Sequence, residues 1–229
     1  MICKLNTIQD KAPFIKLDFN SIQTKIKKRN TYKHIMLSQI TISEGFDTIQ
    51  RIITQDINTP SPVISCICNH QGKVTQRFWL SRKKTQLVLW IEEESQEQLL
   101  NALKHYDIQE TLKIQDIKCV SHQSTEIISE ENWPITLIKN KIITITPELI
   151  NQHTPFALGL IEHNAICFEK GCFIGHEPIA RVKYRGKSKK SLTYTQSKEL
   201  PSTAVNCYHD GENYHSLSIT LNQKAPHAL

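Results

Sequence analysis

A single cysteine between two glycines is the feature of this chain most suited to chemistry. Cys172 lies within the segment Lys-Gly-Cys-Phe-Ile-Gly-His-Glu, residues 170–177. Glycine permits positive φ angles and close backbone approach, so Gly171 and Gly175 favour tight turns that present the thiol. The thiolate is the reactive form of cysteine and is favoured by nearby cations such as Lys170. The segment indicates a functional thiol, and a small residue buried in a tight turn is the structural alternative.

Basic residues occupy every second position of the segment that follows the cysteine. They are Arg181, Lys183, Arg185, Lys187 and Lys189. Alternate side chains of an extended strand point to one side, so we expect a strand with a cationic ladder beside the thiol. Val182 and Tyr184 would then face the core. Three roles stay open for the ladder: contact with RNA phosphates, binding of an acidic ligand, or protection of an edge strand.

Cys66, Cys68 and His70 form a second group with metal-ligand chemistry. On one strand, these alternate side chains would share a face. Residues this close along a strand do not surround an ion tetrahedrally without ligands from elsewhere. We therefore favour a pair of core-facing cysteines followed by a turn histidine, and predict no metal site.

Composition and charge limit the classes of protein to consider. The chain has 229 residues, of which 39% are hydrophobic and 22% charged, and its formal net charge is +6. These values are typical of a globular protein, and the positive charge favours anionic partners such as nucleic acid. Seven cysteines without a secretory-type N-terminus indicate a cytoplasmic protein. No stretch approaches the roughly 18 apolar residues of a membrane helix, so we expect no membrane partner.

Hydrophobic patterning predicts the elements that must position these side chains. Strands are predicted at 34–42, 63–68, 74–80, 86–92 and 112–120, and helices at 43–53 and 95–106. Ser43 is the expected N-cap of the first helix, and Gly72 supplies the unusual dihedral angle of a hairpin turn at 69–73. The order β-α-β-β-β-α-β predicts an α+β fold of ferredoxin-like kind. Further strands are expected at 191–195 and 215–221.

Residues 170–177 resemble the signature Lys-Gly-Cys-(Tyr/Phe)-x-Gly-Gln-Glu of the YgfZ-type folate-binding, tRNA-modifying proteins. These are relatives of the aminomethyltransferase (T-protein) of the glycine cleavage system. His176 is a departure, because the family has Gln at this position. Thr54-Gln55-Asp56, Gly72-Lys73, residues 130–134 and Thr146-Pro147-Glu148 resemble further elements of the family.

The resemblance implies ferredoxin-like units of the aminomethyltransferase folate-binding fold. A folate-binding-like domain would span residues 1–190, with halves at about 1–120 and 121–190, and a short β region would span 191–229. A long family segment near residue 121 is missing here, and the C-terminal region is too short for the family's barrel. We therefore expect a shortened member with a truncated C-terminal sheet.

By the same resemblance, the expected cofactor is tetrahydrofolate or a related folate. Glu130 stands at the family's acidic position near the pterin, where a carboxylate can accept two parallel N–H bonds; a surface carboxylate is the alternative. Trp133 is a candidate for stacking on the pterin. The other expected ligand-binding residues are Lys170, Gly171, Gly175, His176, Glu177, Arg181, Lys183, Tyr184 and Arg185.

The resemblance implies an accessory protein that supports assembly or repair of iron–sulfur enzymes, including those that modify tRNA, with Cys172 as its working group. Its expected partners are iron–sulfur enzymes or assembly proteins, and tRNA. Aminomethyl transfer is not expected, because Val74-Thr75-Gln76-Arg77 lacks the aspartate that the T-protein carries there. Two alternatives stay open: an RNA-binding module in which Cys172 is structural, and a tetrahydrofolate-dependent one-carbon transferase.

Overall fold

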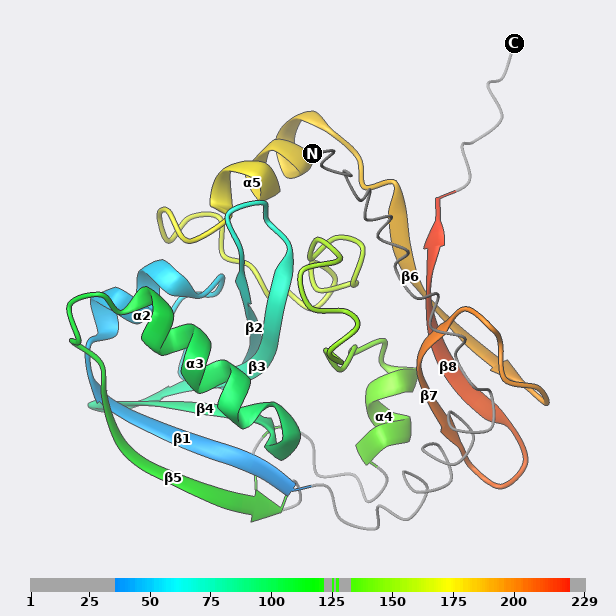
Figure 1. Ribbon diagram of the computed structural model, residues 1–229, viewed down its shortest axis with the longest axis horizontal. Helices are drawn as coiled ribbons and strands as arrows, with labels where there is room; N and C mark the ends of the chain where they lie inside the picture. Colours follow the sequence, from blue (N-terminus) through cyan, green and yellow to red (C-terminus); the bar gives the residue numbers. More distant parts are fainter. Residues whose placement is uncertain (1–35, 122–124, 126, 128–132, 223–229) are drawn as a thin grey trace, which may run out of the picture. The chain divides into compact units, whose positions relative to one another are not determined.

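Five antiparallel strands in the first half of the chain form one sheet, in the order β2-β3-β4-β1-β5 (Figure 1). The computed structural model describes residues 36–121, 125, 127 and 133–222. The elements of this half are β1 (Met36–Glu44), α2 (Phe46–Ile52), β2 (Val63–Cys68), β3 (Val74–Lys83), β4 (Gln86–Glu92), the 3₁₀ turn η1 (Glu93–Ser95), α3 (Gln96–Tyr106) and β5 (Lys113–Ser121). The predicted order β-α-β-β-β-α-β is confirmed. The expected N-cap Ser43 is wrong, since this residue belongs to β1 and Gly45 caps α2.

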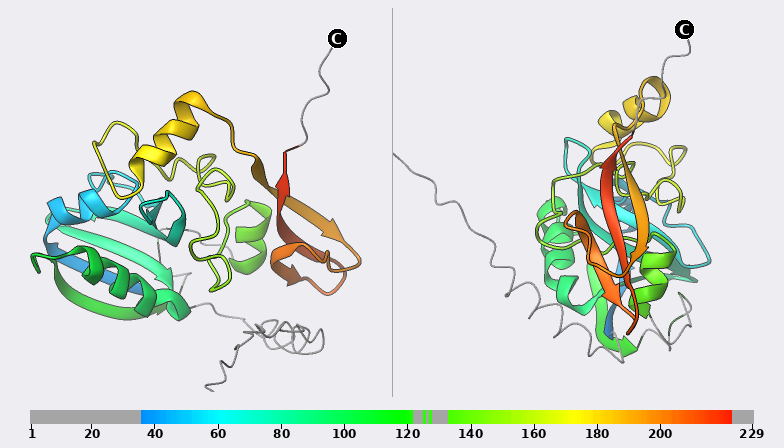
Figure 2. Two further views of the ribbon diagram at one scale, coloured as in Figure 1. Left: turned by 45° about the horizontal axis from the view of Figure 1, so that its top comes forward. Right: turned by 90° about the vertical axis from the view of Figure 1, so that its right-hand side faces the viewer.

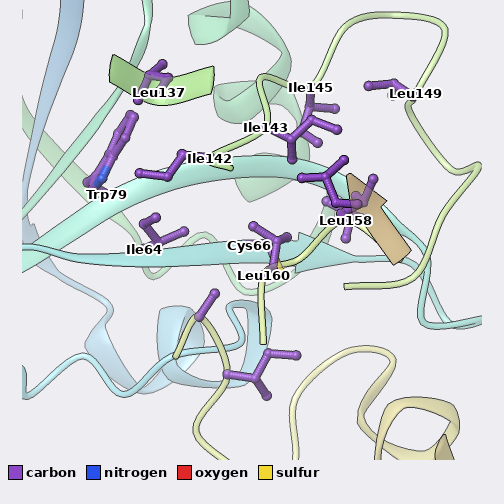
Figure 3. Packing of buried hydrophobic residues seen from close by; sticks show 14 of the residues in the cluster. Ile64, Cys66, Trp79, Leu137, Ile142, Ile143, Ile145, Leu149, Leu158 and Leu160 are labelled. Carbon is purple, nitrogen blue, oxygen red and sulfur yellow. The ribbon is translucent and has the colours of Figure 1, made fainter. Parts of the chain in front are cut away.

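Alternation along the strands gives each face of the sheet its own core. One face carries Ile40, Phe78 and Leu80, which pack with Leu99 and Leu103 of α3. The other face packs against helix α4 (Trp133–Lys139) and the coil that follows it. Figure 3 shows this second core, in which Trp79 and Cys66 meet residues from outside the sheet. Those residues include Leu137, Ile142, Ile143, Ile145, Leu149, Leu158 and Leu160.

The second half of the chain contributes two helices and a smaller sheet. Its elements are α4 (Trp133–Lys139), α5 (His176–Arg185), β6 (Lys190–Ser197), β7 (Ala204–His209) and β8 (Tyr214–Leu221). The three strands are antiparallel and lie side by side in the order β6-β8-β7 (Figure 2). Leu192 and Leu217 belong to the same core as Trp133, and α4 contacts β7 and β8. The division predicted at residue 190 stays a prediction.

The strands predicted at 191–195 and 215–221 are confirmed as β6 and β8, but β7 was not predicted. Its sequence, Ala-Val-Asn-Cys-Tyr-His, has a polar residue in the middle and no buried face. The Asn206 amide pairs with the backbone of Thr144, accepting a hydrogen bond of 2.8 Å from its N–H and donating one of 3.2 Å to its carbonyl. The polar side chain of Asn206, which obscures the strand pattern in the sequence, therefore finds its hydrogen-bond partner 62 residues away.

Asp210 closes the β7–β8 hairpin. Its Oδ1 accepts hydrogen bonds from the backbone N–H groups of Asn213 (2.7 Å) and Glu212 (2.8 Å), and its Oδ2 lies 2.7 Å from His215 Nε2. The N–H of Asn213, His215 and the N–H of Glu212 hold the pKa of this carboxyl well below its ordinary 3.8. The ionised form of Asp210 is therefore favoured by folding.

We expect this hairpin to make folding acid-sensitive. Because the folded pKa of Asp210 lies below its unfolded value, the stabilisation is present above about pH 4 and is lost as pH falls through the folded pKa. Urea unfolding across the acidic range should show a shallower loss of stability for Asp210→Asn than for the wild type. Asp116→Asn, at an exposed position of β5, is the matched control. Equal acid dependence of the wild type and Asp210→Asn would contradict this expectation.

Candidate functional site

The coil before the signature segment (residues 170–177) runs along the end of α2. The Thr54 hydroxyl is fully buried and donates to the carbonyl of Ala165 at 2.7 Å. The N–H of Cys167 donates to the carbonyl of Thr54 at 3.0 Å, and the N–H of Ile174 donates to that of Arg51 at 3.0 Å. These contacts join segments more than 100 residues apart in sequence. They give the threonine of the Thr-Gln-Asp element a structural role after the first helix.

Lys170 anchors the start of the signature segment. Its ammonium donates to the carbonyls of Ile53 (2.8 Å) and Gln55 (3.0 Å), and also to that of Gln50. Burial lowers the pKa of Lys170 to about 8, against the opposing charges of Asp56 and Cys167. An ammonium has three hydrogens, so these carbonyls use its whole donor capacity. The ligand role expected for Lys170 stays a prediction, and a ligand would compete with these three carbonyls.

Gly171 and Gly175 both adopt the positive φ angles expected for them, but for different reasons. Gly171 has a φ of 98° in open space, where a Cβ would meet no atom within 4 Å. Gly175 has a φ of 79°, and its Cβ would overlap the carbonyl oxygen of Asn69. Between them Cys172 is exposed, while Phe173 is buried. The structure therefore confirms that the turns present the thiol; its functional role stays a prediction.

The tip of the β2–β3 hairpin packs directly on the start of α5. Gly72 has a φ of 71°, as the predicted turn requires, and a Cβ there would lie 3.1 Å from side-chain atoms of Ile179 and Pro178. The Asn69 side chain braces the turn, because its Oδ1 accepts from the N–H groups of Gln71 (2.9 Å) and Lys73 (3.0 Å). This amide oxygen therefore fixes the turn that packs on α5.

The prediction of a strand with a cationic ladder is wrong, because residues 176–185 form helix α5. Gly175, in the left-handed conformation, is the N-cap, and Glu177 lies in the first turn, where the helix dipole favours an acid. Successive residues turn by about 100° in a helix, so Lys183 points away from the side that Arg181 and Arg185 share. Tyr184, expected in the core, is 70% exposed. The run of basic residues from 181 to 189 is nevertheless exposed throughout.

Aromatic rings join α5 to the coil that carries the cysteine. The His176 ring lies 4.8 Å from that of Phe173, and the Tyr184 ring lies 5.9 Å from that of Phe168. Lys183 Nζ lies 5.4 Å from the Phe168 ring centre. His176, which departs from the family's Gln, therefore serves the packing of the signature segment.

Comparison with known proteins agrees with this geometry. No protein-family model matches the chain. It is 29% identical to the tRNA-modifying protein YgfZ of Blochmanniella pennsylvanica over 175 residues, which cover 76% of this chain and 42% of the relative. It is 39% identical to that of Aliivibrio fischeri (strain MJ11) over 66 residues, 29% of this chain and 21% of the relative. The chain is similar to the YgfZ-type proteins over three quarters of its length.

The fold of this chain is that of the T-protein. It matches the crystal structure of the glycine cleavage system aminomethyltransferase T from Bartonella henselae with a TM-score of 0.57 at 8% identity, covering 86% of this chain and 81% of that one. The predicted fold class is thereby confirmed. The matched regions span between about a fifth and two fifths of the two YgfZ relatives. Within the described residues, no helix is long and apolar enough to cross a membrane.

The structure places Cys66 and Cys68 in the core, as favoured from sequence. Both thiols are fully buried, with their Sγ atoms 3.9 Å apart. The contact with Cys66 and burial raise the pKa of Cys68 well above its ordinary value. His70 lies exposed in the turn after β2, as the favoured prediction of a turn histidine has it. The described residues contain no group of three metal-ligating side chains.

The residues after the hairpin glycine are engaged with protein groups. Gln76 is buried, and its amide donates to Gln98 of α3 at 3.2 Å. Arg77 is also buried, donates to the carbonyl of Ile143 at 3.0 Å and forms an ion pair with Glu92. The absence of a carboxylate here is visible in the sequence, but the burial of this guanidinium is not. It could be found only from its partners in β4 and in the coil after α4.

Of the two residues expected to contact a pterin, the structure describes only Trp133. Glu130 lies outside the described residues. Trp133 begins α4 and is fully buried, with its ring 5.2 Å from that of Trp79. Its ring is thus part of the core that joins the two sheets.

Proposed function

We propose that this protein is a YgfZ-type accessory factor for tRNA modification, which acts in the cytoplasm on iron–sulfur enzymes or on the proteins that assemble them. One observation carries the proposal. Cys172 is exposed within the family signature, while the residues around it are held by Lys170 and Gly175. A presented thiol on a braced turn suits transient contact with a partner.

Thiolate coordination is the chemistry proposed for Cys172. Iron–sulfur clusters are held by cysteine thiolates, so an exposed thiolate can act as a temporary ligand while a cluster is transferred or repaired. The buried cysteines Cys66 and Cys68 are unsuited to this role, because a partner cannot reach them. The cluster is cargo in this proposal, and no resident metal is invoked.

A folate such as tetrahydrofolate is the proposed ligand, in line with the T-protein fold. The exposed guanidinium groups of Arg181 and Arg185 fit the carboxylates of a folate tail, since guanidinium and carboxylate pair through two hydrogen bonds. Glu130 would accept N–H bonds from the pterin, and His176, Glu177, Lys183 and Tyr184 lie on the same helix as the two arginines. A bound folate can carry one-carbon units.

Rescue of a deletion strain tests the role of Cys172. We expect the wild-type protein to restore methylthio-modified adenosine in tRNA and Cys172→Ala to fail, although the variant should fold normally. Exposed substitutions of this kind change stability by roughly 0.5 kcal/mol or less. Cys119→Ala, which replaces an exposed cysteine of β5, is the matched control and should rescue. The readout is the modified nucleoside measured by mass spectrometry.

Two outcomes would contradict the proposal. Rescue by Cys172→Ala would make the thiol structural and move the function to another part of the surface. A deletion strain with unchanged iron–sulfur enzyme activity and tRNA modification would remove the role altogether.

A basic RNA-binding module is the second candidate. The observation in its favour is the exposure of all five basic residues between 181 and 189. Salt-dependent binding of tRNA by the purified protein, unchanged by Cys172→Ser, would support this candidate over the first. One-carbon transfer is a weaker third possibility, which would require methylene transfer with purified components.

A further inference from the structure

A cationic cluster outside the signature segment lies where three segments meet. Its members are Lys73 at the end of the β2–β3 turn, His153 in the coil after α4, and Lys190 at the start of β6. These residues share no pattern in the sequence, because 80 positions separate Lys73 from His153 and 37 more separate His153 from Lys190. Only the packing of the second half against the hairpin brings them together.

Backbone hydrogen bonds hold the segment after Lys73 beside the coil that contains His153. The N–H of Val74 donates to the carbonyl of His153 at 2.8 Å, and the N–H of Asn151 donates to that of Val74 at 2.9 Å. Lys73 Nζ lies 3.3 Å from the carbonyl of Gln152. The Asn69 amide, which braces the turn, also donates to Asn151 Oδ1 at 2.9 Å. The lysine and the imidazole therefore keep a defined relation.

The third cation, Lys190, is positioned by β6. This strand pairs with β8 from Lys190 onward, so the first residue of the strand is held. Two residues further on, Leu192 packs in the shared core with Leu158, and a Cβ on Gly159 would lie 3.4 Å from it. The start of β6 thus packs against the coil at residues 158–159, shortly after His153.

The electrostatic surroundings of His153 are positive. Burial, then Lys190, then Lys73 lower the pKa of its imidazole, so the charged groups that act on the ring are both cations. Within the described residues, the imidazole makes no hydrogen bond of its own. Two ammonium groups thus act on a half-buried imidazole, and one of them, that of Lys73, lies at the carbonyl of the residue before it.

We propose that Lys73, His153 and Lys190 form a binding site for a phosphate group. Ammonium groups are compact point charges that suit phosphate oxygens, and a tetrahedral anion can accept hydrogen bonds from three directions at once. The imidazole supplies a further N–H donor from the third segment. The site uses neither the thiol nor the signature helix, so it can be tested separately from the proposed function.

Histidine NMR signals of the full chain, recorded at neutral pH, test the site. Sodium phosphate should shift the His153 ring signal in a saturable manner, whereas sodium chloride at equal ionic strength should not. His163, whose ring lies 3.3 Å from the carbonyl of Lys141, serves as the internal reference. Lys190→Ala should weaken phosphate binding by roughly tenfold, as expected for loss of one charged hydrogen bond. Lys187→Ala, an exposed lysine between α5 and β6, should bind as the wild type does.

The proposal is overturned if phosphate shifts His153 no more than chloride does, or if Lys187→Ala and Lys190→Ala weaken binding equally. Lys73→Ala is a second variant, and the remaining histidine signals report whether each variant is folded. Competition by a short single-stranded RNA would identify the phosphate as that of a polynucleotide backbone. Saturable binding of inorganic phosphate without such competition would identify a free phosphate or a small phosphomonoester.

Discussion

Gly175→Ala is expected to lower the free energy of unfolding by about 3 kcal/mol or more. A left-handed conformation costs a residue with a Cβ about 1–2 kcal/mol. At Gly175 the added Cβ would also overlap the carbonyl oxygen of Asn69 and lie 3.1 Å from the Cα of Gly72. Both neighbours are backbone atoms of a hydrogen-bonded turn, so neither can move aside cheaply. Urea unfolding followed by the fluorescence of the buried tryptophans measures the loss.

Gly171→Ala is the matched control for this substitution. Gly171 also has a positive φ, but nothing lies within 4 Å of a Cβ placed there. Only the conformational cost applies, so the expected loss is about 1 kcal/mol. Equal losses at the two glycines would show that the contact between the hairpin and the start of α5 contributes little. A larger loss at Gly175 would show that this contact places the turn on which Cys172 is presented.

Lys170→Met is expected to lower the free energy of unfolding by about 3 kcal/mol, because it leaves backbone carbonyls without their charged donor. The carbonyls of Gln50, Ile53 and Gln55 all lose their bond to the ammonium. Methionine keeps the length and the apolar stem of the side chain, so the loss reports mainly on these bonds. Lys183→Met, at an exposed position of α5, should change stability by roughly 0.5 kcal/mol or less.

The pH dependence of the same variant separates charge from packing. Burial lowers the pKa of folded Lys170 to about 8 from its ordinary 10.5, so the unfolded chain binds more protons between these values. Stability from this group therefore rises with pH across that window. The difference in stability between the wild type and Lys170→Met should increase from about pH 8 to pH 10.5. A constant difference would mean that Lys170 keeps its ordinary pKa in the folded protein.

The two substitutions test one structural idea. The signature segment carries Cys172, but its shape depends on elements from the first half of the chain. Lys170 ties it to the end of α2, and Gly175 lets it touch the hairpin tip. If both variants unfold easily and also fail to restore tRNA modification, only the Cys172→Ala result can separate a loss of chemistry from a loss of structure.

Hydrophobic alternation determined the first half of the fold from sequence alone. Strands β2 and β4 begin and end at the predicted residues, because their apolar side chains must enter one of two cores. The turn at residues 69–73 was predictable for a local reason as well, since Gly72 supplies the positive φ that it requires. The signature segment was also recognisable, since its glycines and cysteine are encoded within eight residues.

Tertiary structure alone decided the conformation of the basic segment. The basic residues from 181 to 189 are exposed, so no buried face selects their period, and their alternation says nothing about the backbone. Helix α5 buries Ile179 against the hairpin and begins where Gly175 meets Asn69, which are contacts with residues about 100 positions earlier.

The same reason applies to the other features that the sequence did not reveal. The polar residue Asn206 makes β7 unrecognisable in the sequence, because its partner Thr144 is known only from the structure. Lys170 resembles a ligand-binding cation in the sequence, because the carbonyls that it binds are likewise known only from the structure. Lys73, His153 and Lys190 have no common pattern in the chain. The sequence by itself determined which segments must be buried and which residue types could do chemistry. Folding decided which polar groups meet, because their partners lie far away along the chain and only packing brings them within hydrogen-bond reach.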